Sequence, residues 1–330
     1  MYQMLCFLMA TIVYGTEIGH CQAPGTVAVT FESSTHSDFR QLLTGEAATG
    51  KVTIRADLVF PDVKKDRYPA VIVVHTITGY RDANEGYVAA ELRKAGFATL
   101  AYDSFAARGT TGAAMSGSPG YLPAGVADAY AALRLLASDP RIDADKIAVL
   151  GFSFGGDVAH LTAFERLRSG LSSGASRFAA HVAFYPSGSI GAVAERDAYT
   201  GSPVLMLLGG KDDNLPVAKI ENYLAYARAA GASAPIETVI YPDAYHAWTV
   251  PSLVSLRFYP DYVSTKKCPM LLLGRGAPMF LVDGQAMPFD PSAFGACMRE
   301  APGYSMQFNE AVRARSIADA VRFLQRNLQP

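Results

Sequence analysis

The chain contains a serine, an aspartate and a histidine in an order and a setting that suit nucleophilic catalysis. Ser153 lies in the run Gly-Phe-Ser-Phe-Gly, Asp212 in Gly-Gly-Lys-Asp-Asp, and His246 in Tyr-Pro-Asp-Ala-Tyr-His. A serine hydroxyl is a weak nucleophile at neutral pH, so it needs a histidine that takes its proton and a carboxylate that orients the histidine. The three residues therefore predict covalent hydrolysis, with Ser153 as nucleophile, His246 as base and Asp212 as acid.

The elements predicted around Ser153 make its motif more specific than five residues alone would be. The apolar run 147–151 predicts a strand that ends in the motif, and a helical pattern begins at Phe154. In such a strand–turn–helix the glycines let the two backbones approach closely, and the helix N-terminus lies near developing negative charge. The alternative is a chance occurrence of the motif in an ordinary loop.

The acid and the base are predicted to meet Ser153 at one edge of a sheet. Asp212 follows one apolar run of strand length, and His246 follows the next. The carboxyl ends of neighbouring parallel strands lie together, so their loops bring such side chains within hydrogen-bonding distance. Asp213 and Asp243 are alternative acids, since they lie in the same two loops.

Two backbone N–H groups are predicted to bind the oxyanion that forms when Ser153 attacks a carbonyl. One belongs to Phe154, directly after the nucleophile, and the other to Ile77 in the loop 75–79. One such donor stabilises the transition state by about 3 to 4 kcal/mol. The alternative for the loop 75–79 is a simple strand exit with a glycine turn.

The elements that must position these residues alternate along the chain, with helical patterns between apolar runs of strand length. The predicted strands are 71–75, 98–102, 147–151, 180–185, 204–208 and 236–241. The predicted helices are 85–95, 124–137, 154–167 and 217–230. Residues 26–32 and 51–60 predict an antiparallel start of the sheet, and 308–328 a closing amphipathic helix. This alternation predicts an α/β class with a mostly parallel central sheet and helices on both faces, and the serine turn specifies an α/β-hydrolase fold.

Residues 24–330 are predicted to form one such domain, with an irregular excursion at about 249–307. Scattered proline, glycine and aromatic residues break the alternation there, between the last strand and the last helix. Loops of this kind lie over the carboxyl ends of the strands, so the excursion is expected either to shape the substrate pocket or to form a flap on the solvent side.

The composition favours small-molecule chemistry. Of 330 residues, 50% are apolar and 18% are charged, and the formal net charge is −1. This balance excludes the strong positive field by which proteins bind nucleic acid or an anionic membrane surface. The sequence contains no HExxH, HxxEH or paired-cysteine pattern, so no metal and no cofactor are predicted.

The N-terminal residues 1–23 are predicted to be a signal peptide, because their apolar run is shorter than a membrane-spanning helix. Cleavage would remove two of the four cysteines and leave Cys268 and Cys297, which suits export into an oxidising compartment, periplasmic or extracellular. A mis-assigned start and a cytoplasmic location are the alternative. The two late cysteines form either a disulfide or two buried thiols, and the mature chain is predicted to have no integral membrane segment.

Taken together, the motifs resemble those of the dienelactone hydrolase family of α/β hydrolases, over roughly residues 50–248 and the final helix. The matching blocks are Val71–His75 followed by Gly79, Ala101–Phe105 with Arg108-Gly109, Gly151–Gly156, Gly209–Asp212 with Pro216, and Tyr241-Pro242 with His246–Trp248. The resemblance implies the same site residues as the motifs do, namely Ser153 as nucleophile, Asp212 as acid, His246 as base, and Ile77 and Phe154 as oxyanion donors.

Three positions depart from the family pattern. The name-giving enzymes use cysteine where this chain has Ser153, and serine with histidine suits ordinary esters, so dienelactone is not the expected substrate. Thr76 replaces a glycine common in related members, which predicts a differently tilted oxyanion loop. Arg108 lies near the arginine that holds the substrate carboxylate in the named enzymes, but a salt bridge to Asp103 or a surface position is its expected use here.

The sequence therefore predicts a cofactor-free hydrolase of small-molecule carboxylic esters or lactones that works through an acyl-enzyme. A serine peptidase or an acyltransferase on the same fold is the first alternative, because the choice of acceptor depends on pocket shape. A secreted binding protein without catalysis is the second. The oligomeric state is left open.

Overall fold

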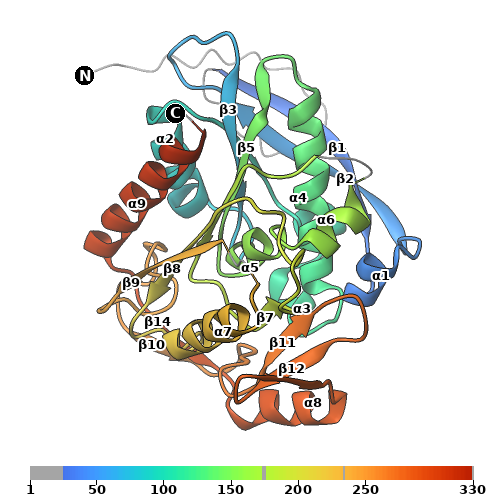
Figure 1. Ribbon diagram of the computed structural model, residues 1–330. Coiled ribbons are helices and arrows are strands. Elements are labelled where there is room, and N and C mark those ends of the chain that lie inside the picture. Colours follow the sequence, from blue (N-terminus) through green and yellow to red (C-terminus); the bar gives the residue numbers. More distant parts are fainter. Residues whose placement is uncertain (1–24, 173–175, 233–234, 329–330) are drawn as a thin grey trace, which may run out of the picture.

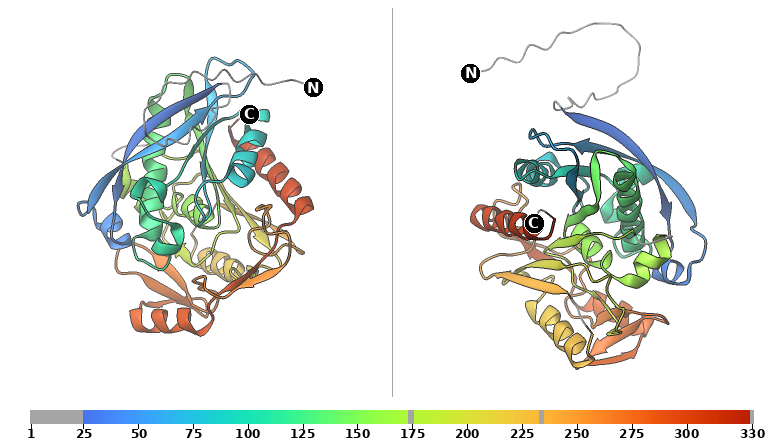
Figure 2. Two further views of the ribbon diagram at one scale, coloured as in Figure 1. Left: turned by 180° about the vertical axis from the view of Figure 1, so that it is seen from behind. Right: turned by 45° about the horizontal axis from the view of Figure 1, so that its top comes forward.

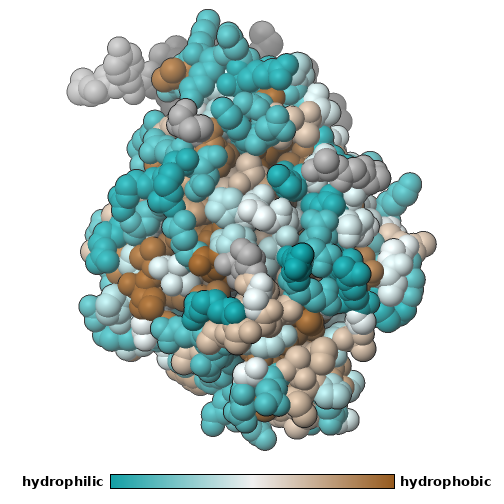
Figure 3. Space-filling view, in the orientation of Figure 1, coloured by the Kyte–Doolittle hydropathy of each residue, from teal (hydrophilic) through white to brown (hydrophobic). Residues whose placement is uncertain are grey.

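The computed structural model describes residues 25–172, 176–232 and 235–328. The predicted signal peptide, residues 1–23, lies outside these ranges and stays a prediction. Within the described residues, no helix combines the length and the apolar character needed to cross a membrane. On the face drawn in Figure 3, hydrophilic residues predominate, and hydrophobic residues form smaller areas between them.

A central eight-stranded sheet carries the fold (Figure 1). In spatial order its strands are β1 (Thr26–Thr35), β2 (Gly50–Val59), β4 (Ala98–Tyr102), β3 (Tyr68–Val74), β5 (Ile142–Phe152), β6 (Ala180–Phe184), β8 (Val204–Gly209) and β9 (Ile236–Tyr241). β1 pairs antiparallel with β2, and β2 with β4, whereas the other neighbours are parallel. The mostly parallel sheet with an antiparallel start is therefore confirmed.

Both faces of the sheet are covered, and alternate side chains of the inner strands enter two separate cores. Ile72 and Val74 of β3 pack with the helices on one face, and Val71 and Val73 pack on the other. Figures 1 and 2 show α4, α5 and α6 on the first side of the sheet and α2 and α9 on the second. Apolar residues at successive positions thus make each inner strand buried on both faces, as parallel strands require.

The predicted helices are present, one of them broken, and three further α-helices that were not predicted occur in the described residues. Their bounds are α1 (Phe39–Thr44), α2 (Tyr87–Lys94), α3 (Gly112–Met115), α4 (Tyr121–Ser138), α5 (Phe154–Leu161), α6 (Glu165–Leu171), α7 (Val217–Ala229), α8 (Pro291–Glu300) and α9 (Glu310–Leu328). The prediction of one helix over 154–167 is wrong, because α5 ends at Leu161. Phe164 leaves the helix to form a bridge with Tyr199, and the Thr162 hydroxyl donates to the Ala159 carbonyl at 2.8 Å.

The segment 249–307, predicted as an irregular excursion, contains short regular elements. β11 (Met270–Leu273), β12 (Met279–Val282) and β13 (Gln285–Pro288) form a second sheet that is completed by β7 (Ile190–Ala192). β10 (Arg257–Tyr259) pairs with β14 (Tyr304–Met306). Cys268 and Cys297 form a disulfide that ties the start of this sheet to α8 across 29 residues, a constraint of about 3 to 4 kcal/mol in the chain-entropy model.

The two ends of this segment are joined to each other by backbone hydrogen bonds. The Gln307 N–H donates to the His246 carbonyl at 3.2 Å, and the Asn309 N–H donates to the Trp248 carbonyl at 3.0 Å. The segment therefore leaves the core and rejoins it at one place, directly beside His246. Figure 2 shows most of it gathered at one end of the molecule.

Candidate active site

Ser153 lies in a strained turn between β5 and α5. Its φ of 52° and ψ of −108° are rare for a residue with a side chain. A Cβ on Gly151 would overlap the backbone of Gly155, and a Cβ on Gly155 would overlap the carbonyl of Val74. Glycine is therefore required on both sides of the serine, which is the physical reason for the motif seen in the sequence.

Three predicted residues form a continuous line of hydrogen bonds. The Ser153 hydroxyl lies 2.9 Å from His246 Nε2, and His246 Nδ1 lies 2.8 Å from Asp212 Oδ2. The second oxygen of Asp212 accepts the N–H groups of Asn214 and Leu215 at 2.9 and 3.2 Å. Because a carboxylate only accepts, the proton of the neutral imidazole lies on Nδ1, and Nε2 is free to accept the serine proton. All three side chains are buried.

The two alternative acids lie elsewhere. Asp213 accepts the Ser305 N–H at 2.8 Å and pairs with Lys266 at 3.5 Å. Asp243 pairs with Lys211 at 3.2 Å, and its side chain is 80% exposed. The carboxylate that reaches His246 is therefore that of Asp212.

Two aromatic rings hold the His246 imidazole in place. Tyr185 at the end of β6 meets it edge-on at 5.1 Å between ring centroids, and Tyr304 of β14 meets it at 4.9 Å. Neither contact was predicted from the sequence. For Tyr304 no local signal exists, because it reaches His246 only through the folding of the 249–307 segment.

The loop 75–79 is held by the side chain of His75. Its Nε2 accepts the Ser104 N–H at 2.9 Å, so the proton lies on Nδ1, which donates to the Thr76 carbonyl at 2.6 Å. In a trans peptide the C=O and N–H groups point in opposite directions. The N–H of Ile77 therefore points away from His75, and Ile77 and Phe154 lie with Ser153 on the wall of one cavity.

Glu85 fixes the same loop from the other side. Its buried carboxylate accepts the Thr76 and Arg81 N–H groups and the side-chain amide of Asn84, each at 3.0 Å. Burial raises the pKa of Glu85, and the hydrogen bonds from Thr76 and Asn84 together with the nearby His75 oppose that rise. From the sequence, Glu85 was predicted only to start a helix, and this role has no local signal.

Arg108 does not form the salt bridge to Asp103 that was expected. It makes a bidentate pair with Asp128 of α4 at 2.7 and 2.8 Å, and its side chain is 9% exposed. Asp103 instead accepts the Phe105 and Ala106 N–H groups, both at 2.9 Å. The arginine thus ties the loop after β4 to α4 and is already neutralised by Asp128.

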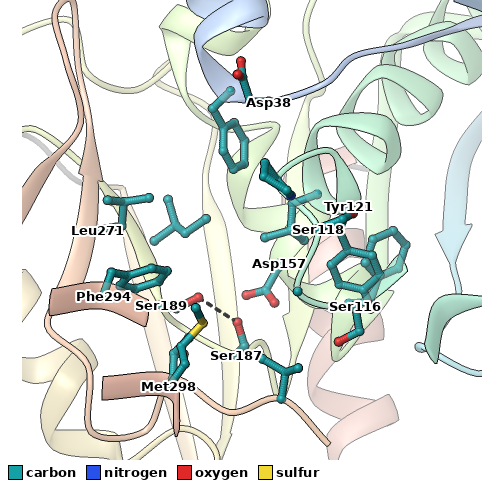
Figure 4. Close-up of a pocket in the computed structure, with 18 of the residues that line it drawn as sticks. Asp38, Ser116, Ser118, Tyr121, Asp157, Ser187, Ser189, Leu271, Phe294 and Met298 are labelled. Atoms are coloured by element: carbon teal, nitrogen blue, oxygen red, sulfur yellow. Dashed lines mark hydrogen bonds between the residues drawn. The ribbon is translucent and has the colours of Figure 1, made fainter. Parts of the chain in front are cut away.

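A cavity of about 560 Å³ opens beside Ser153. One wall comes from the core of the fold, and the facing wall comes from the 249–307 segment, whose lining residues include Val263, Leu271, Phe289, Phe294, Met298 and Tyr304. Figure 4 shows Leu271, Phe294 and Met298 on one side of the cavity and Tyr121 on the other. Of the two expectations for this segment, the one in which it shapes the pocket is therefore correct.

One carboxylate inside this cavity was missed by the sequence analysis. Asp157 lies four residues after Ser153 in α5, is 8% exposed, and accepts the Gly188 N–H at 3.2 Å. Burial raises the pKa of Asp157 to about 6, against opposing hydrogen bonds from Ser187 and Gly188 and the nearby His246. The spacing of four in a helix that starts at the nucleophile could have revealed it, since such residues share one face.

Replacing Asp157 by asparagine is expected to change how stability depends on pH. The pKa of about 6 in the folded chain exceeds the ordinary 3.8, so folded protein binds more protons and loses stability as pH rises from about 4 to about 6. The variant Asp157→Asn does not have this loss. The difference in free energy of unfolding between the variant and the wild type should therefore shift by about 1 kcal/mol in favour of the variant when the pH is raised from 5 to 8. Urea denaturation at the two pH values measures the change. The exposed Asp243→Asn variant should show no such shift. An equal difference in stability between Asp157→Asn and the wild type at both pH values would contradict the prediction.

Within the described residues, no group of three or more histidine, cysteine, aspartate or glutamate side chains is arranged to hold a metal ion.

Comparison with known proteins identifies the fold and its relatives. Residues 54–264 match the model of the dienelactone hydrolase family. Two curated proteins named "Putative carboxymethylenebutenolidase" are similar to the chain. The one from Yersinia pestis is 29% identical over 197 residues, or 57% of this chain and 71% of that protein. The one from Methylorubrum extorquens is 27% identical over 203 residues, or 58% of this chain and 67% of that protein.

A solved structure shares the fold over most of the chain. It is a dienelactone hydrolase-like promiscuous phosphotriesterase from metagenomic libraries, with a TM-score of 0.57 at 18% identity. The match covers 92% of this chain and 99% of that one. The α/β-hydrolase fold predicted from the sequence is therefore confirmed.

Proposed function

The chain belongs to the dienelactone hydrolase family and is a hydrolase, and from this premise we propose that it cleaves carboxylic esters or lactones with Ser153 as the nucleophile. The observation that carries the proposal is the hydrogen-bonded line from Ser153 through His246 to Asp212. Its reactive end lies on the wall of the cavity, where a substrate carbonyl has access to it.

The proposed reaction has two halves. His246 Nε2 takes the Ser153 proton while Oγ attacks the carbonyl carbon, and the N–H groups of Ile77 and Phe154 bind the oxyanion. The carbon–oxygen bond to the alcohol then breaks, and His246 returns the proton to the departing oxygen, which leaves an acyl-serine. Water, deprotonated by His246, releases the acid in the same way. Asp212 stabilises the imidazolium in both halves.

The polar and apolar parts of the site support an ester or lactone substrate. The base has its acceptor nitrogen aimed at Ser153, and much of the remaining cavity wall is apolar or aromatic. The curated relatives are named for a lactone-opening activity, carboxymethylenebutenolidase. Peptide cleavage and acyl transfer to an acceptor other than water are the alternative functions, and the experiment below tests both.

A fluorophosphonate probe is expected to label the wild-type protein at Ser153 alone. Mass spectrometry of the digested protein should place the added mass on the peptide that contains Ser153. In parallel, short-chain esters, lactones, short peptides and mixtures of ester with added alcohols are tested as substrates. Hydrolysis of esters or lactones without peptide cleavage or transfer to alcohols is the expected pattern. Labelling of another residue, or turnover of peptides only, would contradict the proposal.

A further inference from the structure

The cavity beside Ser153 contains a carboxylate that the proposed reaction does not use. Asp157 lies one helical turn after the nucleophile and lines the same cavity. Figure 4 shows its carboxylate between Tyr121 on one side and Ser187 and Ser189 on the other. In the proposed reaction Asp212 is the carboxylate that orients His246, and Asp157 takes part in no step.

The local hydrogen bonds leave Asp157 with acceptor capacity. One oxygen accepts the Gly188 N–H at 3.2 Å, and both the backbone N–H and the hydroxyl of Ser187 also donate to the carboxylate, so three donors reach it within the protein. The Ser187 and Ser189 hydroxyls lie 3.0 Å apart and form a hydrogen bond with each other. A carboxylate has about four lone-pair directions, so a donor on a bound molecule can still reach it from the cavity.

Three aromatic side chains line the same cavity as Asp157. They are Tyr121, Phe154 and Tyr304, and the Tyr121 and Phe154 rings lie 4.6 Å apart. Aromatic faces next to a carboxylate attract an ammonium group through both the ring quadrupole and the negative charge. The Arg40 side chain, which also lines the cavity, is 61% exposed and pairs with Glu46, so its charge is directed to the solvent side.

We propose that Asp157 is a specificity-determining residue that selects esters carrying an ammonium group on the part of the molecule held in this cavity. The inference rests on the proposed esterase function for its kinetic test. The competing explanation is that Asp157 only holds the turn at Ser187 and Gly188, in which case it would not discriminate between substrates.

Matched substrates test the discrimination. The 4-nitrophenyl esters of 4-(aminomethyl)benzoic, 4-(hydroxymethyl)benzoic and 4-methylbenzoic acid have the same shape near the carbonyl and differ at one distant group. Each kcat/KM is divided by the rate of hydroxide hydrolysis of the same ester, which removes the electronic effect of the substituent. At pH 8 the wild type should prefer the aminomethyl ester over the methyl ester by about 10- to 100-fold, the size of a charged hydrogen bond.

The variant Asp157→Asn should bring this ratio to near one, and the surface variant Asp243→Asn should keep it at the wild-type value. An unchanged ratio in Asp157→Asn would overturn the proposal. So would a wild-type preference for the hydroxymethyl ester as large as that for the aminomethyl ester, because it would show a neutral donor site.

A binding experiment separates this inference from the proposed function. With the wild type, 4-methylbenzylammonium should bind by calorimetry at least about 10-fold more tightly than 4-methylbenzyl alcohol, and this measurement requires neither turnover nor a variant. Selective ammonium binding without hydrolysis of any ester would remove the esterase proposal and leave the ammonium site. Ester hydrolysis with equal binding of amine and alcohol would remove the ammonium site alone.

Discussion

Replacement of Ser153 or of His246 by alanine is expected to lower kcat for ester hydrolysis by about a million-fold, because the first change removes the nucleophile and the second removes the base hydrogen-bonded to it. The hydrogen bond of 2.9 Å between their side chains makes them one functional unit. The double variant should therefore be no slower than either single variant, since the second change removes an interaction that is already lost. Steady-state hydrolysis of 4-nitrophenyl acetate measures all three.

The exposed Ser169→Ala variant in α6 serves as the control for loss of a serine hydroxyl and should retain wild-type kcat. Circular dichroism and thermal unfolding should show that the alanine variants fold. A folded Ser153→Ala enzyme with undiminished esterase activity would remove Ser153 as the nucleophile. Losses that multiply in the double variant would show that Ser153 and His246 act separately.

Replacement of Asp212 by asparagine is expected to lower kcat by about 10⁴-fold, the effect seen when the acid of such a triad becomes an amide. One oxygen of Asp212 accepts the backbone N–H groups of Asn214 and Leu215. The amide oxygen of the new side chain should keep these bonds, which turns its NH₂ group toward His246. A donor at that position forces the imidazole proton onto Nε2, so the nitrogen that faces Ser153 can no longer accept a proton.

The neighbouring variant Asp213→Asn provides a matched control. Its oxygen can still accept the Ser305 N–H, and the change removes only the pair with Lys266 at 3.5 Å. Its kcat should stay within about threefold of the wild type, since a partly exposed ion pair contributes little. A larger loss in Asp213→Asn than in Asp212→Asn would reverse the assignment of the acid.

The sequence predicted best those parts of the site where the backbone geometry itself requires particular residues. The turn at Ser153 needs glycine at 151 and 155 for steric reasons, so its residues are visible as a motif. Asp212 follows the buried strand β8, and His246 follows the edge strand β9, so each lies in a loop at the carboxyl end of a parallel strand. The sheet and the hydrogen-bonded line of the candidate site were therefore both predictable from short-range patterns.

What the sequence concealed depends on contacts between distant segments. The break after Leu161 contains neither glycine nor proline, and it arises because Phe164 pairs with Tyr199. The strands of the 249–307 segment are only three or four residues long, and β11 gains a parallel partner only from β7. Short apolar runs between prolines and glycines have no periodicity of their own that separates them from a loop.

The joined ends of the 249–307 segment bear on how this protein could diversify. Because the chain leaves the sheet near Trp248 and returns at Asn309, with a hydrogen bond of 3.0 Å between those positions, an insertion or deletion between them need not displace β9 or α9. The disulfide inside the segment gives it a cross-link that does not involve the sheet. Natural selection, or a protein engineer, could exchange the part of the segment before Tyr304 as a cassette and present new substrates to the same serine and histidine, with Tyr304 kept against His246.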